Sequence, residues 1–371
     1  MKGQWIGDYT GTNTGTIIVN VDELPSHFQG VAYLKDNNPL LPGTGVGFKT
    51  KDKNSPGEIQ TSEIFPIDPQ TGVVSSWAQV KHLYCQNVRI PTSAQVKVVF
   101  GSDCLKLSWT TDVGTSAECT LPRSKAEESS DIVAKEMDWE AYKKYVATLE
   151  GRNFVFRGQN ERWRLRTAFH RTGRADLTRF LREDVQVLHR HLSARTKHVF
   201  NLQIPEQNGA FLHMVQHHGY PTPLLDWSYS PYVAAFFAYR GISNIKAAES
   251  SVDAKVRVHV FNHAQWKSDL NQLVMLLTTS PHLSICEFMA IENERMIPQQ
   301  ALSTITNLDD IETYVRSKEA EDKKYLWAID LPVKERRRIV QELSFMGITA
   351  GALFPGLDGA CEELRERNFG I

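Results

Sequence analysis

Three short segments carry residues whose types and spacing could support chemistry, and the first is Arg157-Gly158-Gln159. An apolar run typical of a buried strand, residues 154–156, ends at this arginine, glycine and amide. A guanidinium at the end of a buried strand can bind an anion, and a glycine beside it lets another backbone approach closely. The sequence therefore predicts an anion-binding corner at Arg157.

The second segment, residues 217–232, combines a helix end, a rigid apolar run and the polar corner Asp226-Trp227-Ser228. We expect a new helix to begin at Pro231, with Ser230 well placed as its N-cap. Asp226 could form a turn with its own backbone or pair with an arginine. Both roles of Asp226 stay open, and capping alone could explain Ser230.

The third segment, residues 292–298, reads Glu-Asn-Glu-Arg-Met-Ile-Pro. We expect a strand over residues 288–297, which would present the two carboxylates in succession. Glu294 could stabilise a positive charge that develops during a reaction. It could equally be an exposed strand residue that pairs with Arg295, since most glutamates lie on the surface.

The elements that position these segments follow a β-rich first part of the chain. Alternating apolar residues, interrupted by turn signals, predict an antiparallel β sandwich or small barrel over residues 1–121. We expect residues 5–11 to form an edge strand, and the domain to have an accessory or partner-binding role. The alternating runs are residues 15–21, 95–100 and 105–109, and the turn signals include Pro42-Gly43 and Pro56-Gly57.

Small polar residues at 122–134 have the composition of a linker, so we place a domain boundary there. Residues 135–371 then mix helices and strands, which makes the chain α+β overall. Asp138 is expected to cap the first helix of this part, and Asp358 one of the last. The other expected elements are helices over residues 177–196, 209–218 and 334–346 and a strand over residues 255–261.

Composition indicates a folded protein with a sizeable core, because 371 residues carry 42 Lys+Arg against 43 Asp+Glu. Neither a run of about 20 apolar residues nor an N-terminal signal peptide is evident, so we expect a cytoplasmic protein without membrane insertion. The five scattered cysteines suggest reduced, mostly structural residues. His213 and His217 have the spacing of zinc ligands but lack a clear third ligand, so no metal is expected.

Positive charge is concentrated between residues 152 and 198. This segment contains eleven arginines and Lys197 but only four acidic residues, a local surplus of eight positive charges in a chain of formal net charge −1. Such a cluster can be a solvated helix surface, or it can be a landing site for phosphates of a nucleotide or nucleic acid. Both interpretations remain open.

Taken together, these motifs resemble the FRG-domain family, named after its Phe-Arg-Gly motif, over roughly residues 135 to 365. Three positions depart from the family pattern, because Pro223 stands where an arginine is usual, Ala301 where glycine is favoured and Ser303 where phenylalanine is favoured. The matching motifs are Phe156-Arg157-Gly158-Gln159, Trp163, the segments at residues 218–222 and 224–231, Arg295 with Gln299, and Gly347-Ile348 with Leu353-Phe354-Pro355.

The resemblance implies an ADP-ribosyltransferase-like fold, with NAD as co-substrate and no metal. In that layout an early arginine, here Arg157, holds NAD, and a late glutamate, here Glu294, is catalytic. Gln299 would orient NAD or the acceptor, and Tyr220, Trp227 or Tyr232 would stack on the nicotinamide. The remaining NAD-binding residues that the resemblance implies are Gly158, Gln159, Thr222, Asp226, Ser230 and Arg295.

Some FRG-domain proteins resemble toxins of bacterial anti-phage toxin–antitoxin systems. The resemblance therefore implies a regulated toxin with an antitoxin, and possibly a chaperone, as protein partners. The basic surplus makes RNA the expected acceptor of ADP-ribose, with mRNA modification blocking translation. Protein is the alternative acceptor, and a non-catalytic RNA-binding module is the alternative function, with Arg157 on a phosphate and Trp227 stacked on a base.

Overall fold

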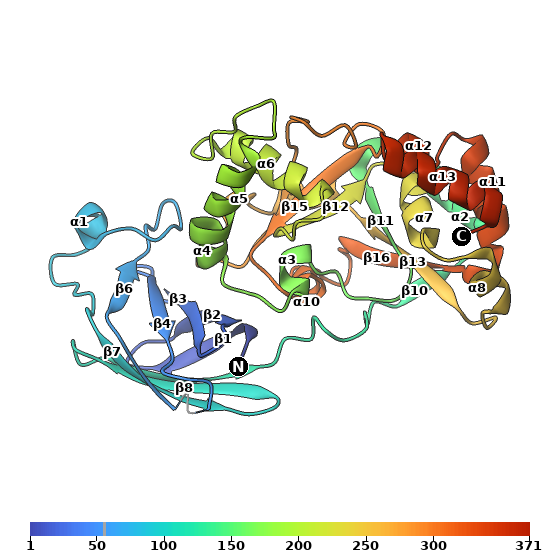
Figure 1. Ribbon diagram of the computed structural model, residues 1–371. Helices are drawn as coiled ribbons and strands as arrows, with labels where there is room; N and C mark the ends of the chain where they lie inside the picture. The colour runs from blue at the N-terminus through green and yellow to red at the C-terminus, as the bar shows by residue number, and fades with distance from the viewer. Residues whose placement is uncertain (55–56) are drawn as a thin grey trace.

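The computed structural model describes residues 1–54 and 57–371 and contains two β-sheets, one in each part of the chain (Figure 1). Pro56, expected in a turn with Gly57, lies outside the described residues. The fold class is α+β, because the first part is a large antiparallel sheet and most helices come later. No helix in the described ranges has the length and apolar character needed to cross a bilayer.

The N-terminal sheet has nine strands in the order β5-β7-β8-β9-β1-β2-β3-β4-β6, and every neighbouring pair is antiparallel. One short helix, α1 (Trp77–Val80), lies in a connection. The strands are β1 Gly3–Gly11, β2 Gly15–Glu23, β3 Phe28–Asp36, β4 Thr44–Lys49, β5 Glu58–Thr61, β6 Glu63–Pro66, β7 Ala94–Phe100, β8 Cys104–Thr111 and β9 Ser116–Pro122.

This sheet curls into a nearly closed barrel because its two edge strands, β5 and β6, follow one another along the chain. β6 pairs with β4 while β5 pairs with β7, so residues 58–66 join the two sides through a bend at Ser62. At the bend, Thr61 Oγ1 donates a hydrogen bond of 2.6 Å to the Gly47 carbonyl. The barrel alternative is thus the observed one, and the expected edge strand at residues 5–11 is wrong, because β1 lies between β2 and β9.

The second sheet has seven strands in the order β10-β16-β13-β11-β12-β15-β14, and β10–β16 is its parallel pair. Its strands are β10 Ala134–Glu136, β11 Val155–Gln159, β12 Leu224–Ser228, β13 Lys255–Phe261, β14 Leu283–Cys286, β15 Ala301–Thr306 and β16 Leu326–Pro332. Its helices are α2 Trp139–Ala147, α3 Ala168–Arg171, α4 Leu177–Arg179, α5 Val185–Leu192, α6 Pro205–His217, α7 Pro231–Tyr239, α8 Asn244–Glu249, α9 His263–Asp269, α10 Ile311–Arg316, α11 Arg336–Phe345, α12 Ala350–Leu353 and α13 Leu357–Phe369.

One face of this sheet is apolar and is covered by α2, α7 and α11. The alternate residues Val256, Val258 and Val260 of β13 point into this core, as expected for the period of two along a strand. Gly158 allows α7 to pack directly on β11, because a Cβ there would lie 1.9 Å from the Ala234 carbonyl oxygen. This glycine therefore serves helix–strand packing.

The opposite face of the sheet is polar at its centre. Arg157 and Gln159 of β11 lie beside His259 and Arg257 of β13 on this face. Arg257 makes a buried two-pronged ion pair with Asp330 of β16, at 2.8 and 3.1 Å. The polar side chains of the first predicted segment therefore belong to a layer of charged and amide groups beneath the sheet.

Most expected elements of the second part are present. Asp138 caps α2 by accepting the Ala141 amide at 2.7 Å, and Gly347, with φ of 76°, follows the end of α11. The helical region at 177–192 contains a π-helical turn, Phe180–Asp184, between α4 and α5. Two expectations are wrong: residues 288–297 form irregular backbone and turns rather than a strand, and Asp358 lies in the first turn of α13, whose N-cap is Gly356.

The segment between the two sheets is anchored to the second part, although it has the composition of a linker. Ser130 donates to Glu312 at 2.8 Å and accepts from Arg257 at 3.0 Å, while Asp131 pairs with Arg164 at 2.9 Å. The barrel also contacts the second part directly. The buried Asp22 of β2 accepts from Arg174 Nε at 2.7 Å and from two backbone amides, those of residues 175 and 176.

Candidate functional site

The candidate site is a cluster of polar side chains around Asp226, where the three predicted segments meet. Arg157, near the end of β11, donates from Nη1 to the Asp226 carbonyl at 2.6 Å. The helix α6 approaches Asp226 from one side, and the loop of residues 287–300 is hydrogen-bonded to α6. Asp226 and Asn293, which follow Arg157 by 69 and 136 residues in the sequence, are thus brought to one place.

Arg157 has unused hydrogen-bonding capacity. Its Nε is buried without a partner among the described residues, and its side chain as a whole is half-buried. Burial, and next the neighbouring charge of Arg171, lower the pKa of Arg157 to about 10, with Asp226 opposing them. Arg157 is therefore still protonated at neutral pH, and two guanidinium groups act on the same region. An anion placed there would relieve their mutual repulsion.

The carboxylate of Asp226 is held by neutral donors. Gln216 Nε2 donates to Oδ2, and Ser303 Oγ donates to Oδ1 at 3.0 Å. Thr222 in turn donates to Gln216 Oε1, which fixes the orientation of that amide. Neither role expected for Asp226 is the one observed, because Arg157 bonds its main chain and the carboxylate contacts side chains of α6 and β15. Ser303, which departs from the family pattern, here supplies one of these donors.

Asn293 connects the loop to α6. Its Nδ2 donates to His213 Nδ1 at 3.0 Å, and its Oδ1 lies 2.6 Å from His217 Nδ1. His213 Nε2, buried and without a hydrogen bond, lies 3.9 Å from Asp226 Oδ1. The two histidines thus face an asparagine, and within residues 1–54 and 57–371 no group of three or more His, Cys, Asp or Glu side chains is arranged to bind a metal.

Burial lowers the pKa of His213 to about 4, against a weaker opposing effect of Asp226. His213 is therefore neutral in the folded protein at pH values where the unfolded chain already binds a proton. Between pH 6.5 and 4 this residue should lower the free energy of unfolding by about 1.4 kcal/mol for each unit of acidification. His213→Gln should remove this contribution, which urea denaturation at several pH values would measure. Parallel curves for the variant and the wild type would contradict the prediction.

The loop that carries Glu294 has an unusual backbone. Glu292 and Gln300, which lie on either side of Glu294 in this loop, have φ of 51° and 47°, values that side-chain-bearing residues seldom adopt. Glu294 is exposed and has no hydrogen-bond or ion-pair partner among the described residues. Arg295 does not pair with it, because Arg295 Nη1 donates to the His217 carbonyl at 2.7 Å and its guanidinium lies over Phe354. The carboxylate of Glu294 is therefore free.

Gln299 is buried and ties this loop to its surroundings. Its Nε2 donates to the Leu353 carbonyl at 2.9 Å, and its own carbonyl accepts from Ser228 Oγ at 2.7 Å. The neighbouring Ser230 caps α7, with its hydroxyl accepting the Val233 amide at 3.2 Å. Gln299 thus holds the loop against β12 and the C-terminal helices in this conformation.

The three aromatic residues expected to stack on a ligand differ in position. Trp227 is only 3% exposed, stacks on Phe261 and donates from Nε1 to Thr304, so its ring belongs to the core. Tyr232 packs edge-on against Trp139 and is partly exposed. Tyr220 is also partly exposed, beyond the end of α6. The expectation that Trp227 stacks on a ligand is therefore not met in this conformation.

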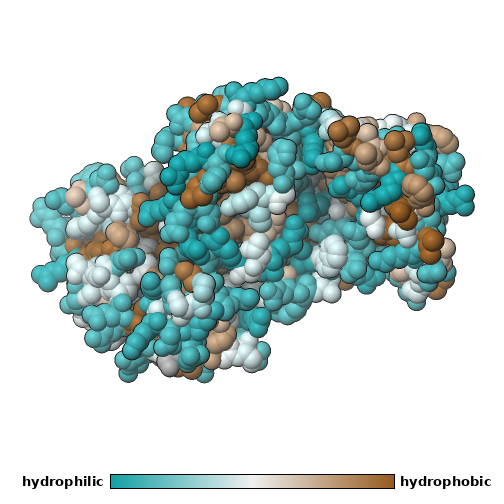
Figure 2. Space-filling model, viewed as in Figure 1, coloured by the Kyte–Doolittle hydropathy of each residue, from teal (hydrophilic) through white to brown (hydrophobic). Residues whose placement is uncertain are grey.

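The basic segment is less free than its sequence suggests. Five of its eleven arginines form ion pairs with carboxylates, namely Arg162, Arg164, Arg166, Arg174 and Arg179. Four exposed cations without a carboxylate partner among the described residues lie on or near α5: Arg182, Arg190, Arg195 and Lys197. Hydrophilic residues predominate on the face of the molecule shown in Figure 2. The unpaired positive charge near α5 thus comes from four of the described residues.

Comparison with known families supports the resemblance seen in the sequence. Residues 152–247 match the FRG domain, so this segment, which contains Arg157 and Asp226, belongs to that family. The match covers β11, α6, β12 and α7, and it ends before the loop of Asn293 and Glu294. No curated protein was found to match the chain.

Proposed function

We propose that this FRG-domain protein is an NAD-dependent ADP-ribosyltransferase in which Arg157 binds the diphosphate of NAD. The observation that carries the proposal is the unpartnered, buried Nε of Arg157 beside the charge of Arg171. A diphosphate offers acceptor oxygens and negative charge to such a pair. An ADP-ribosyltransferase-like arrangement of the second sheet is part of this proposal.

NAD would supply the reactive bond, which joins ribose C1′ to the nicotinamide nitrogen. When this bond breaks, its electron pair leaves with nicotinamide, and an acceptor atom forms a new bond to C1′ and loses a proton to solvent. The carboxylate of Glu294 would stabilise the positive charge that develops on the ribose. Asn293 holds the loop of Glu294 against His213 and His217, close to Asp226 and Arg157.

The residues around Asp226 would orient the site. Gln216 and Ser303 fix the Asp226 carboxylate, and the Asp226 carbonyl fixes one arm of Arg157. Tyr220 and Tyr232 are partly exposed rings that could contact nicotinamide, whereas Gln299, Gly158 and Ser230 act through packing and capping.

The direct test is release of nicotinamide by the purified protein. Glu294→Gln keeps the size of the side chain and removes its charge, so we expect a loss of roughly a hundredfold or more in the rate. Glu321→Gln, at another exposed position, is the matched control and should retain activity. Equal rates in wild type and Glu294→Gln would exclude Glu294, and no nicotinamide release by wild type would reject the enzymatic proposal.

The exposed cations near α5 favour RNA as the acceptor, and with it the proposed role as a translation-blocking toxin restrained by an antitoxin. Transfer of labelled ADP-ribose from NAD to purified mRNA, compared with transfer to a protein lysate, would distinguish the two acceptors. A combined Arg190→Ala, Arg195→Ala and Lys197→Ala variant should lose transfer to RNA while it still releases nicotinamide. Salt-sensitive RNA binding without NAD cleavage would instead support the non-catalytic alternative.

A further inference from the structure

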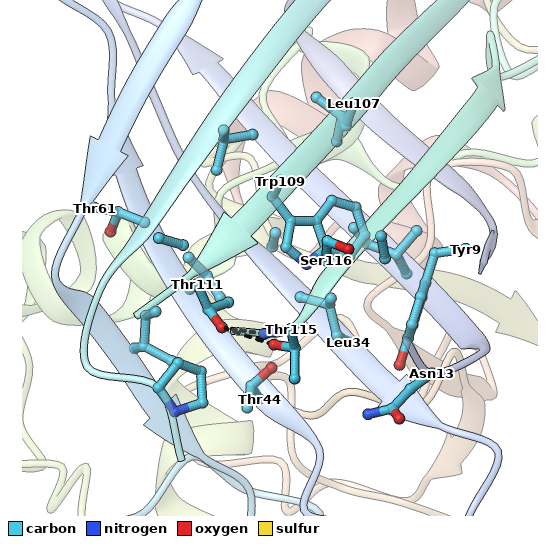
Figure 3. A pocket seen from close by; sticks show the side chains of 18 of the residues that line it. Tyr9, Asn13, Leu34, Thr44, Thr61, Leu107, Trp109, Thr111, Thr115 and Ser116 are labelled. Atoms are coloured by element: carbon cyan, nitrogen blue, oxygen red, sulfur yellow. Dashed lines mark hydrogen bonds between the residues drawn. The ribbon is translucent and has the colours of Figure 1, made fainter. Parts of the chain in front are cut away.

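The interior of the N-terminal barrel contains a cavity of about 190 Å³ (Figure 3). Side chains from all nine strands line it, so it lies inside the barrel rather than on its outer surface. Barrels of about eight strands are just wide enough either to be filled by their own side chains or to hold one small ligand. Here the side chains leave space.

The wall of the cavity is apolar. Leu34, Val96 and Trp109 face the interior next to the barrel core, yet each is only partly buried. Residues that point into a barrel and still retain accessible surface indicate a cavity that solvent-sized molecules can reach. Met1 and Phe48 line the end of the cavity that is opposite the β1–β2 turn.

The mouth of the cavity is polar and lies at the turns β1–β2, β3–β4 and β8–β9. Asn13, Thr44, Thr111 and Ser116 are grouped there in Figure 3, and the hydroxyls of Thr111 and Thr115 are 2.7 Å apart. Hydroxyl and amide groups at this end can donate to or accept from one polar group of a ligand. Barrel mouths with an apolar interior and a few polar groups are frequent sites for small molecules.

The charged side chains lie at the same end. Among the described residues that line the cavity, the charged side chains are Asp36 and Arg89. Asp36 is the last residue of β3, and its carboxylate accepts a hydrogen bond of 3.4 Å from the Tyr9 hydroxyl. An ion placed deeper would lose its water without gaining a partner, which disfavours charged ligands.

We infer that the barrel is a binding site for a small uncharged molecule, with an aromatic ring or short alkyl chain in the interior and one hydrogen-bonding group at the mouth. A dry apolar cavity of about 150 Å³ is known to accept benzene, so this volume suits one ring with a small substituent. The site is separate from Arg157 and Asp226 and does not depend on the proposed transferase activity. It gives the N-terminal domain a function of its own, as a receptor for a small molecule.

The test uses the full chain and benzyl alcohol as the probe, with benzoate as its charged counterpart. Isothermal titration calorimetry should show one molecule of benzyl alcohol bound per chain, with a dissociation constant on the order of 1 mM or lower. Benzoate should bind at least about tenfold more weakly. No binding of benzyl alcohol, or equal binding of both probes, would overturn the assignment.

Two substitutions that fill the cavity and one on the outside locate the site. Val46→Phe and Ala117→Leu each add volume at an inward-facing position and should lower the affinity at least about tenfold. Val99→Phe changes an outward-facing residue of the barrel that is 64% exposed, and it should bind like the wild type. Thermal melts identify whichever filled variant is folded, and unchanged binding by a folded filled variant would overturn the location.

Discussion

Arg157→Lys is expected to lower the rate of nicotinamide release at least about a hundredfold while the protein stays folded. Lysine keeps a positive charge but cannot donate to the Asp226 carbonyl and to a phosphate at the same time with fixed geometry. The guanidinium offers several N–H donors in one plane, and its Nε is unpaired in the present structure. Steady-state kinetics should show the loss mainly as a higher KM for NAD, with a fall in kcat as well.

The matched control is Arg152→Lys, because the Arg152 side chain is exposed and its guanidinium lies over the ring of Tyr229. Its activity should remain within about threefold of the wild type, since exposed cation–π contacts contribute little. An Arg157→Lys variant with the wild-type KM and kcat would show that Arg157 does not bind NAD. In that case the arginine would be a structural link between β11 and β12.

Asp22→Ala should lower the free energy of unfolding by about 3 to 5 kcal/mol, the largest effect on stability that we expect from one polar residue. The side chain of Asp22 is fully buried and accepts two backbone amides at 2.9 and 3.1 Å. It also pairs with Arg174 at 2.7 Å and Arg179 at 3.4 Å. Removing it leaves these donors without their acceptor, which urea denaturation would report.

Asp8→Ala provides the comparison, because Asp8 is an exposed aspartate on β1 of the same barrel. Its replacement should change the free energy of unfolding by less than about 0.5 kcal/mol. A loss below about 1 kcal/mol in Asp22→Ala would mean that water replaces the carboxylate at this contact. The contact between barrel and second part would then contribute little to stability.

Much of the secondary structure could be predicted from local signals. Strand periodicity and helix capping depend on residues that are neighbours in the sequence. Local signals therefore predict the strands β2, β7, β8 and β13 and the helix cap at Asp138. Strand order depends on pairings between distant residues, which local signals do not show, and β1 pairs on both sides rather than lying at an edge. The strand expected over residues 288–297 is a loop instead, and side-chain contacts of Asn293 and Gln299 hold it.

The candidate site could be predicted only in part. Arg157 and Asp226 stand out by type, and the structure does bring them into contact. Asn293, Gln216 and Ser303 were missed as members of the cluster, because amides and hydroxyls are common in any sequence and acquire a role through partners far away in the chain. His213 and His217 are considered as metal ligands and set aside, while their shared partner Asn293 is not predicted.

Strand β2 has a consequence for dissecting this protein into fragments. Its residue Val19 lines the barrel cavity, while Asp22 is bonded to the second part of the chain, so one strand serves both. A fragment that begins at residue 135 would lose Asp22 and also Ser130, leaving Arg174 and Arg257 without these partners. Fragments cut at this boundary should therefore aggregate or misfold, and activity is best measured on the undivided chain.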